Sequence, residues 1–132
     1  DGAASNNNLN MFEEMHLAGV IHNGFGQDAT CVRAEDVINM ATVNGARLQR
    51  REKRGALKVG YFADFIAIDK DKPHLHPCLD IPALIVYSAQ GSDVCLTVCN
   101  GKTLYENGEY KTLDKEKIVY EAERTAGKLY NS

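Results

Sequence analysis

Apolar residues recur at helical spacing near the start of the chain. They are Leu9, Phe12, Met15, Gly19 and His22, with Met11, Ala18 and Ile21 beside them. Positions three or four apart share one face of a helix, so the pattern predicts a helix over residues 8–23. Ser5 or Asn8 is the expected N-cap, and Asn23-Gly24 the expected end. A stripe this wide predicts that a sizeable neighbour covers the helix.

A second helix is predicted over residues 34–44. Val37, Met40 and Ala41 share a face there, and acidic residues stand in the first turn. Gly45 is expected at the left-handed position that ends the helix. The basic run that follows, residues 47–54, is expected to be a solvated connector or helix end, because blocks of like charge are usually exposed.

After Gly55 the sequence pattern changes from helical periodicity to short runs that are typical of strands. Residues 63–69 (ADFIAID) combine β-branched and aromatic side chains and predict a strand. Residues 83–89 (ALIVYSA) fit either a strand or a buried helical turn, since a short apolar run does not distinguish the two.

Two Asn-Gly pairs give the clearest local signal in the sequence. Asn100-Gly101 and Asn107-Gly108 each separate short strand-like runs. Asn-Gly favours type I′ turns, in which both central residues have positive φ. The pattern therefore predicts a meander of strands near 94–99, 102–106 and 109–112. A final helix is then predicted from Asp114 to about residue 130.

Composition narrows the class of protein. The 132 residues are 44% hydrophobic and 25% charged, with a formal net charge of −3, as in an ordinary globular protein. Nothing in this balance indicates a nucleic-acid or membrane partner. The four cysteines form no CxxC pair, so we expect reduced thiols, buried or half-buried, in a cytoplasmic protein.

Histidine spacing gives little indication of a metal site. His74 and His76 form an HxH motif, but prolines at 73 and 77 predict an irregular solvent-exposed loop. His16 and His22 are six positions apart, which does not place a ligand pair on one helical face.

Several segments, in order, resemble one enzyme family. These are DGAASNNNLNMFEEM (1–15), MATVNGAR (40–47), GALKVGYFADFIAID (55–69) and VCNGKTLYENGE (98–109). They resemble the C-terminal part of the metal-dependent amidohydrolases. Within that family they are most similar to the branch of 5-methylthioadenosine/S-adenosylhomocysteine deaminases and triazine-type chlorohydrolases. The resemblance covers nearly the whole chain.

The resemblance implies a role for the first residue. In this family a catalytic Asp follows the last barrel strand, and Asp1 corresponds to it. The chain then represents the C-terminal third of an enzyme that hydrolyses an amino or halo substituent on a purine-like or triazine-like ring. A divalent metal, zinc or iron, is implied, with Asp1 as ligand and proton carrier. Ser5, Asn6 and Asn7 are candidates for substrate contact.

The implied fold class is the end of an α/β barrel followed by β structure. Residues 1–54 would supply the last helices of a (β/α)8 hydrolase barrel. Residues 55–132 would supply strands of a small β-sandwich and a terminal helix. The implied partners are a heterocyclic substrate, the missing N-terminal barrel segment and further copies of the protein in a homo-oligomer.

The chain also departs from the family's pattern. The other metal ligands and the general acid would lie upstream of Asp1, and none of its four histidines matches their positions. We therefore expect residues 1–132 alone to be inactive. The competing interpretation is a non-catalytic, β-rich interaction module without a metal site. An upstream reading frame of about 300 residues with an HxH motif would favour the enzyme, because a barrel of ~250 residues needs that room.

Overall fold

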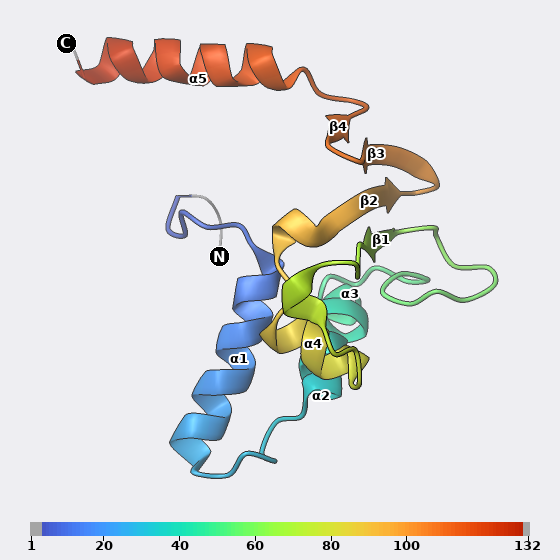
Figure 1. Cartoon of the computed structure of the whole chain (residues 1–132). Coiled ribbons are helices and arrows are strands. Elements are labelled where there is room, and N and C mark those ends of the chain that lie inside the picture. Colours follow the sequence, from blue (N-terminus) through green and yellow to red (C-terminus); the bar gives the residue numbers. More distant parts are fainter. Residues whose placement is uncertain (1–3, 131–132) are drawn as a thin grey trace.

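The computed structural model describes residues 4–130 and shows a group of packed helices, a four-stranded sheet and a terminal helix (Figure 1). The α-helices are α1 (Met11–Gly26), α2 (Ala34–Asn39), α3 (Gly45–Leu48), α4 (Ile81–Tyr87) and α5 (Lys115–Tyr130). The strands are β1 (Phe65–Ile68), β2 (Val94–Cys99), β3 (Lys102–Glu106) and β4 (Glu109–Tyr110). In Figure 1, α5 extends beyond β4, away from the other helices.

The core lies between α1, α2 and α4. Its buried members are Phe12, Met15, Val37 and Val86. Phe12 and Met15 are three positions apart on α1, so the predicted apolar stripe does face the core. Other members of the stripe, including Met11 and Ile21, remain exposed.

The first helix is shifted from its expected bounds. Its N-cap is Asn10, not Ser5 or Asn8: the Asn10 Oδ1 accepts the Phe12 N–H at 3.1 Å. The helix passes Asn23 and ends at Gly26, where Gln27 takes the left-handed conformation with φ 50°. The Asn23 side chain does not end the helix, because it binds both the N–H and the C=O of Val32, at 2.9 and 3.1 Å.

The second helical segment runs further than the sequence indicated. After α2, residues Met40–Asn44 form a π-helical turn that leads directly into α3. The prediction of a left-handed Gly45 is wrong, since its φ is −59°. A Cβ on Gly45 would stand 3.2 Å from the Met40 carbonyl oxygen. The missing side chain therefore relieves crowding in the π turn, a wider turn than an α-helix makes.

Residues 83–87 of the segment 83–89 belong to helix α4, which ends at Tyr87, so the second of its two predicted conformations is correct for most of the segment. Asp80 caps α4 by accepting the Ala83 N–H at 3.0 Å, and a proline stands in the first turn. Val86 is buried against α1 and α2. Tertiary packing decides between helix and strand for this apolar run.

The sheet confirms the meander. Its order is β1-β2-β3-β4, with every neighbouring pair antiparallel. Both Asn-Gly turns have positive φ at their two central residues: 51° and 75° at Asn100-Gly101, and 47° and 93° at Asn107-Gly108. The final helix begins at Asp114, as the sequence predicted, and the Asp114 Oδ1 accepts the Lys117 N–H at 2.9 Å, which caps α5.

Candidate functional site

The loop before α1 is folded by its own asparagine side chains. The Asn6 Oδ1 accepts the backbone N–H of Asn8 at 3.0 Å, and Asn10 caps the helix two residues later. Asparagine side chains commonly accept such local backbone bonds and thereby favour turns over extended chain. The loop conformation from Asn6 to Asn10 is thus set locally.

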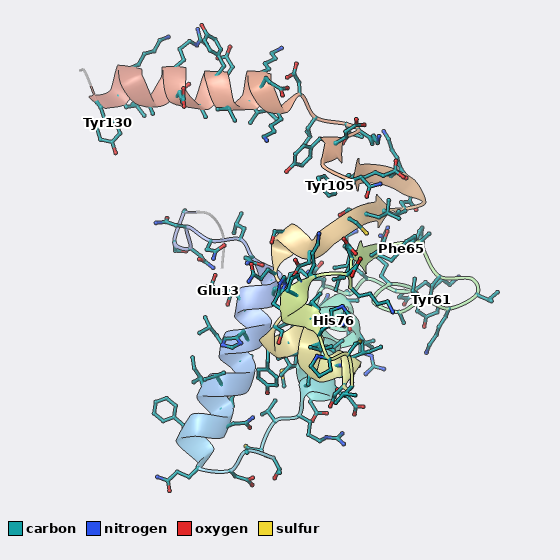
Figure 2. The ribbon with its side chains drawn as sticks, in the orientation of Figure 1. Glu13, Tyr61, Phe65, His76, Tyr105 and Tyr130 are labelled. Carbon is teal, nitrogen blue, oxygen red and sulfur yellow. The ribbon has the colours of Figure 1, made fainter. Side chains whose placement is uncertain are left out.

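The same loop is also bound to the first turns of α1. The Asn6 Nδ2 donates to the Glu14 Oε1 at 3.0 Å, and the Asn8 Nδ2 donates to the Glu13 Oε2. Figure 2 shows Glu13 at the N-terminal end of α1, beside this loop. Glu13 and Glu14 are well placed for the helix dipole, as the sequence indicated. Their bonds to the loop amides were not anticipated, since a helical pattern does not reveal contacts outside the helix.

Three of the four predicted site residues, Ser5, Asn6 and Asn7, lie in or beside this loop. Asp1 lies outside the described residues. Ser5 and Asn7 are exposed, and Asn6 is half-buried with its amide directed at Glu14. Contact of these three residues with a substrate stays a prediction.

A buried carboxylate stands at the start of β2. Asp93 is 4% exposed, and its Oδ2 lies 2.8 Å from the His74 Nε2 and 2.9 Å from the Gln90 N, whose N–H it accepts. Burial raises the pKa of Asp93, but the bonds to His74 and Gln90 outweigh it and hold the pKa below its ordinary value. His74 and His76 are both exposed, as predicted, but residues Pro73–Leu75 form a 3-10 turn, and the bond to Asp93 anchors His74 beside the sheet.

A second polar contact joins the basic connector to the sheet. Arg54 pairs with Asp64, and its guanidinium carbon lies 4.3 Å from the Phe62 ring centroid. Asp64 also accepts the Asn100 N–H at 2.6 Å, the largest cause of its lowered pKa, with Arg54 adding to it. The expectation of a wholly solvated connector is wrong for Arg54, because only the folded chain brings Asp64 to it. Arg47 does fit the expectation, since it is an exposed residue in the last turn of α3.

The thiols and histidines are dispersed. Cys31, Cys78, Cys95 and Cys99 are all free, as predicted, but only Cys95 is half-buried and the other three are exposed. His16 and His22 are exposed on α1, where His16 makes an edge-on contact with Tyr87. Among residues 4–130, no three His, Cys, Asp or Glu side chains gather in a way that could hold a metal ion.

Within the described part of the chain, no helix is both long and apolar enough to span a lipid bilayer.

The sequence profile of the Amidohydrolase family matches residues 1–104. The chain belongs to the amidohydrolase family. This confirms the resemblance found in the sequence motifs. Family membership fits the end of a metal-dependent hydrolase barrel, in which chemistry takes place at the C-terminal ends of the strands.

Curated relatives extend the similarity beyond the profile. The chain is 49% identical over 130 residues to the 5-methylthioadenosine/S-adenosylhomocysteine deaminase of Caldanaerobacter subterraneus. It is 46% identical over 129 residues to the 5'-deoxyadenosine deaminase of Methanosarcina acetivorans. Each match covers 98% of this chain, and the chain spans about 30% of each relative's length.

Solved structures have the same arrangement of elements. A zinc-bound adenosine deaminase from Xanthomonas campestris superposes with a TM-score of 0.93 at 28% identity, over all of this chain and 30% of its own. A zinc-bound atrazine chlorohydrolase from Arthrobacter aurescens gives a TM-score of 0.83 at 26% identity, over 91% of this chain and 27% of its own.

Proposed function

We propose that this amidohydrolase chain is the C-terminal part of a parent protein that hydrolytically deaminates an adenine-type nucleoside, such as 5-methylthioadenosine or S-adenosylhomocysteine. The observation that carries the proposal is the 49% identity to a deaminase of that specificity, sustained over 98% of the chain. The similarity to the chlorohydrolase is lower, at 26% identity, which favours a purine over a triazine.

In the proposed division, residues 1–54 complete the barrel and residues 55–132 contribute to the β-sandwich and end in the terminal helix. The capped helix α1 directly after the loop, and the antiparallel sheet β1–β4, support this division. The parent protein would contain the rest of the barrel upstream of Asp1. Its cytoplasmic location and its assembly as a homo-oligomer stay predictions.

The side chains of the described residues show how much of a metal site this chain could supply. A catalytic zinc site needs about three protein ligands. The described residues offer no such cluster, so this chain would contribute one carboxylate, Asp1, to a site made mainly by upstream residues. Zinc, or iron in its place, would supply the Lewis acidity that lowers the pKa of water toward neutrality.

Asp1 would perform the proton transfers. Its carboxylate would accept a proton from the attacking water and deliver that proton to the departing amine as ammonia forms. A carboxylate suits both steps, because it can act as a general base and then, once protonated, as a general acid. The Ser5–Asn8 turn would shape the mouth of this site.

Assays of the parent protein test the proposal. We expect ammonia release from 5-methylthioadenosine and S-adenosylhomocysteine, with a lower kcat/KM for guanine and for chlorinated triazines. Asp1→Asn should lower turnover by about 10²–10⁴-fold with little effect on folding, because an amide cannot accept the proton. Wild-type turnover in Asp1→Asn, or no hydrolysis of any purine, would contradict the proposal and favour a non-catalytic module.

A further inference from the structure

The sequence contains the dipeptide Asn-Gly at four places, all within the described residues. In such a pair the backbone nitrogen of the glycine can attack the side-chain amide carbon of the asparagine, because glycine has no side chain that shields its nitrogen. The four pairs have this local chemistry in common, so a difference in their reactivity must come from the structure around them. They are Asn23-Gly24, Asn44-Gly45, Asn100-Gly101 and Asn107-Gly108.

The two pairs in helical segments are held by hydrogen bonds. Asn23 lies on α1, and two hydrogen bonds to the Val32 backbone, at 2.9 and 3.1 Å, fix its side-chain amide. Asn44 ends the π-helical turn, and the Gly45 N–H donates to the Met40 carbonyl. A side chain bound on both sides cannot turn toward the next nitrogen. A nitrogen that donates its proton to a carbonyl must give up that bond before it attacks.

The two pairs in the hairpin turns have nearly the same surroundings. Their φ angles are 51° and 75° at Asn100-Gly101, and 47° and 93° at Asn107-Gly108. Both pairs are exposed, and no atom lies within 4 Å of the Cβ position of either glycine. The asparagine N–H is bonded in each turn, to the Asp64 Oδ1 at 2.6 Å and to the Cys95 carbonyl at 2.8 Å.

The glycine N–H groups of these two turns differ. The Gly101 N–H donates to the Ala63 carbonyl at 3.0 Å, which ties the first turn to the chain before β1. In the second turn, no group of the described residues accepts a hydrogen bond from the Gly108 N–H. The attacking nitrogen is therefore protected in the first turn and accessible to water in the second.

We propose that Asn107 is a site of spontaneous deamidation, and the most reactive of the four pairs. The Gly108 nitrogen loses its proton and bonds to the Asn107 Cγ. The bond from Cγ to Nδ2 breaks, and Nδ2 leaves with a proton as ammonia. Water then opens the cyclic imide at one of its carbonyls, which gives aspartate or isoaspartate. In sum, water and the amide are consumed and a carboxylic acid and ammonia are formed, without an oxidant or a cofactor.

The product changes the turn between β3 and β4. It places a new carboxylate between Glu106 and Glu109, whose charges Lys111 already balances through contacts of 3.6 and 2.7 Å. The isoaspartate form also adds a methylene group to the backbone of a two-residue turn, where loop length sets the register of the strands. The pairing of Tyr105 with Tyr110 should therefore weaken.

The test follows all four pairs in the full-length protein during incubation at neutral pH. Trypsin cleaves after lysine and arginine, so each pair falls in its own peptide, and Asn107 is the only amide side chain in residues 103–111. Mass spectrometry measures the deamidated fraction of each peptide with time, and a zero-time digest corrects for deamidation during digestion. Asn100-Gly101 is the matched control, and the same protein in urea gives the rates without folded structure.

In the folded protein we expect Asn107 to deamidate about 5–10-fold faster than Asn100, the factor to which the net free energy of one hydrogen bond corresponds. The pairs at Asn23 and Asn44 should be slower still, because their helical segments must open first. In urea the four rates should converge, since the dipeptide is the same in each.

Three outcomes would overturn the proposal. The first is an equal rate at Asn107 and Asn100 in the folded protein, and the second is a faster rate at either helical pair. The third is deamidation of Asn107 in urea only, which would show that the rest of the protein covers this turn. None of these measurements depends on catalysis, so the result is independent of the proposed function.

Discussion

The Oδ2 of Asp93 lies 2.8 Å from the Nε2 of His74, and this contact joins the loop of residues 69–77 to the start of β2. A backbone bond reinforces it, in which the Asp69 N–H donates to the Asp93 carbonyl at 2.8 Å. Asp93 is buried, so its charge is stable only because these donors replace the water it lost.

The lowered pKa of Asp93 predicts acid sensitivity. A depressed folded-state pKa stabilises the protein above the unfolded value of 3.8, and that contribution is lost as pH falls below it. Asp93→Asn should therefore cost about 1–3 kcal/mol of unfolding free energy at pH 7, and the difference from wild type should shrink below about pH 4. Urea denaturation across this pH range measures the difference in unfolding free energy.

Asp71→Asn is the control, because Asp71 is an exposed residue of the same loop, and it should have little effect. A loss of unfolding free energy in Asp93→Asn that stays the same below pH 3 would contradict the stabilising role of the ionised Asp93.

Gly55 should tolerate no side chain. A Cβ there would stand 2.7 Å from the Thr42 carbonyl oxygen and 2.9 Å from the Val43 Cα, both backbone atoms. Gly60 is a matched control, because its φ of 82° is almost the same as the 81° of Gly55, but no atom lies within 4 Å of its Cβ position. We expect Gly55→Ala to lower the unfolding free energy by about 1–3 kcal/mol more than Gly60→Ala does. Equal losses in the two variants, measured by chemical denaturation, would show that only φ matters.

The first Asn-Gly turn gives a prediction that is independent of catalysis. Gly101 has φ 75°, and a β-branched side chain is strained in that region. Gly101→Val should lower the melting temperature by a few degrees, since a loss of about 1 kcal/mol shifts it by roughly 2–4 °C in a domain of 150–250 residues and somewhat more in a smaller one. Gly127→Ala on α5 is the control and should be neutral or stabilising, because alanine favours a helix. An unchanged melting temperature in Gly101→Val would argue against the turn.

The 132-residue chain on its own should associate and should not deaminate. The exposed face of α1 includes Leu17, Val20, Ile21 and Phe25, and exposed apolar patches of this kind promote association. Light scattering should show species larger than a monomer, and the double variant Val20→Lys/Phe25→Lys should reduce them. Zinc titration should reveal no tight site. A monodisperse monomer that binds zinc tightly, and loses it in Asp1→Ala, would contradict this view.

The sequence predicted the elements whose signals are local. The two Asn-Gly turns, the strands at 94–99 and 102–106 and the helix start at Asp114 were correct, and the last strand proved shorter than predicted, at Glu109–Tyr110. Each signal depends on residues within a few positions of one another. Helix ends were less accurate. Asn23 has the residue type of a helix end, but its side chain is bound to Val32, nine positions away, and the helix continues past it.

By itself, the sequence determined the family and the meander, since ordered motifs and turn residues are properties of the chain alone. Only the tertiary structure decided that residues 81–87 form a helix, that Arg54 meets Asp64 and that Glu14 binds Asn6. The physical reason is that an apolar run can be buried as a helix or as a strand, and an arginine or a glutamate can bind any of several oppositely charged or polar partners. The conformation of the run and the partner of each side chain therefore depend on which elements pack beside them.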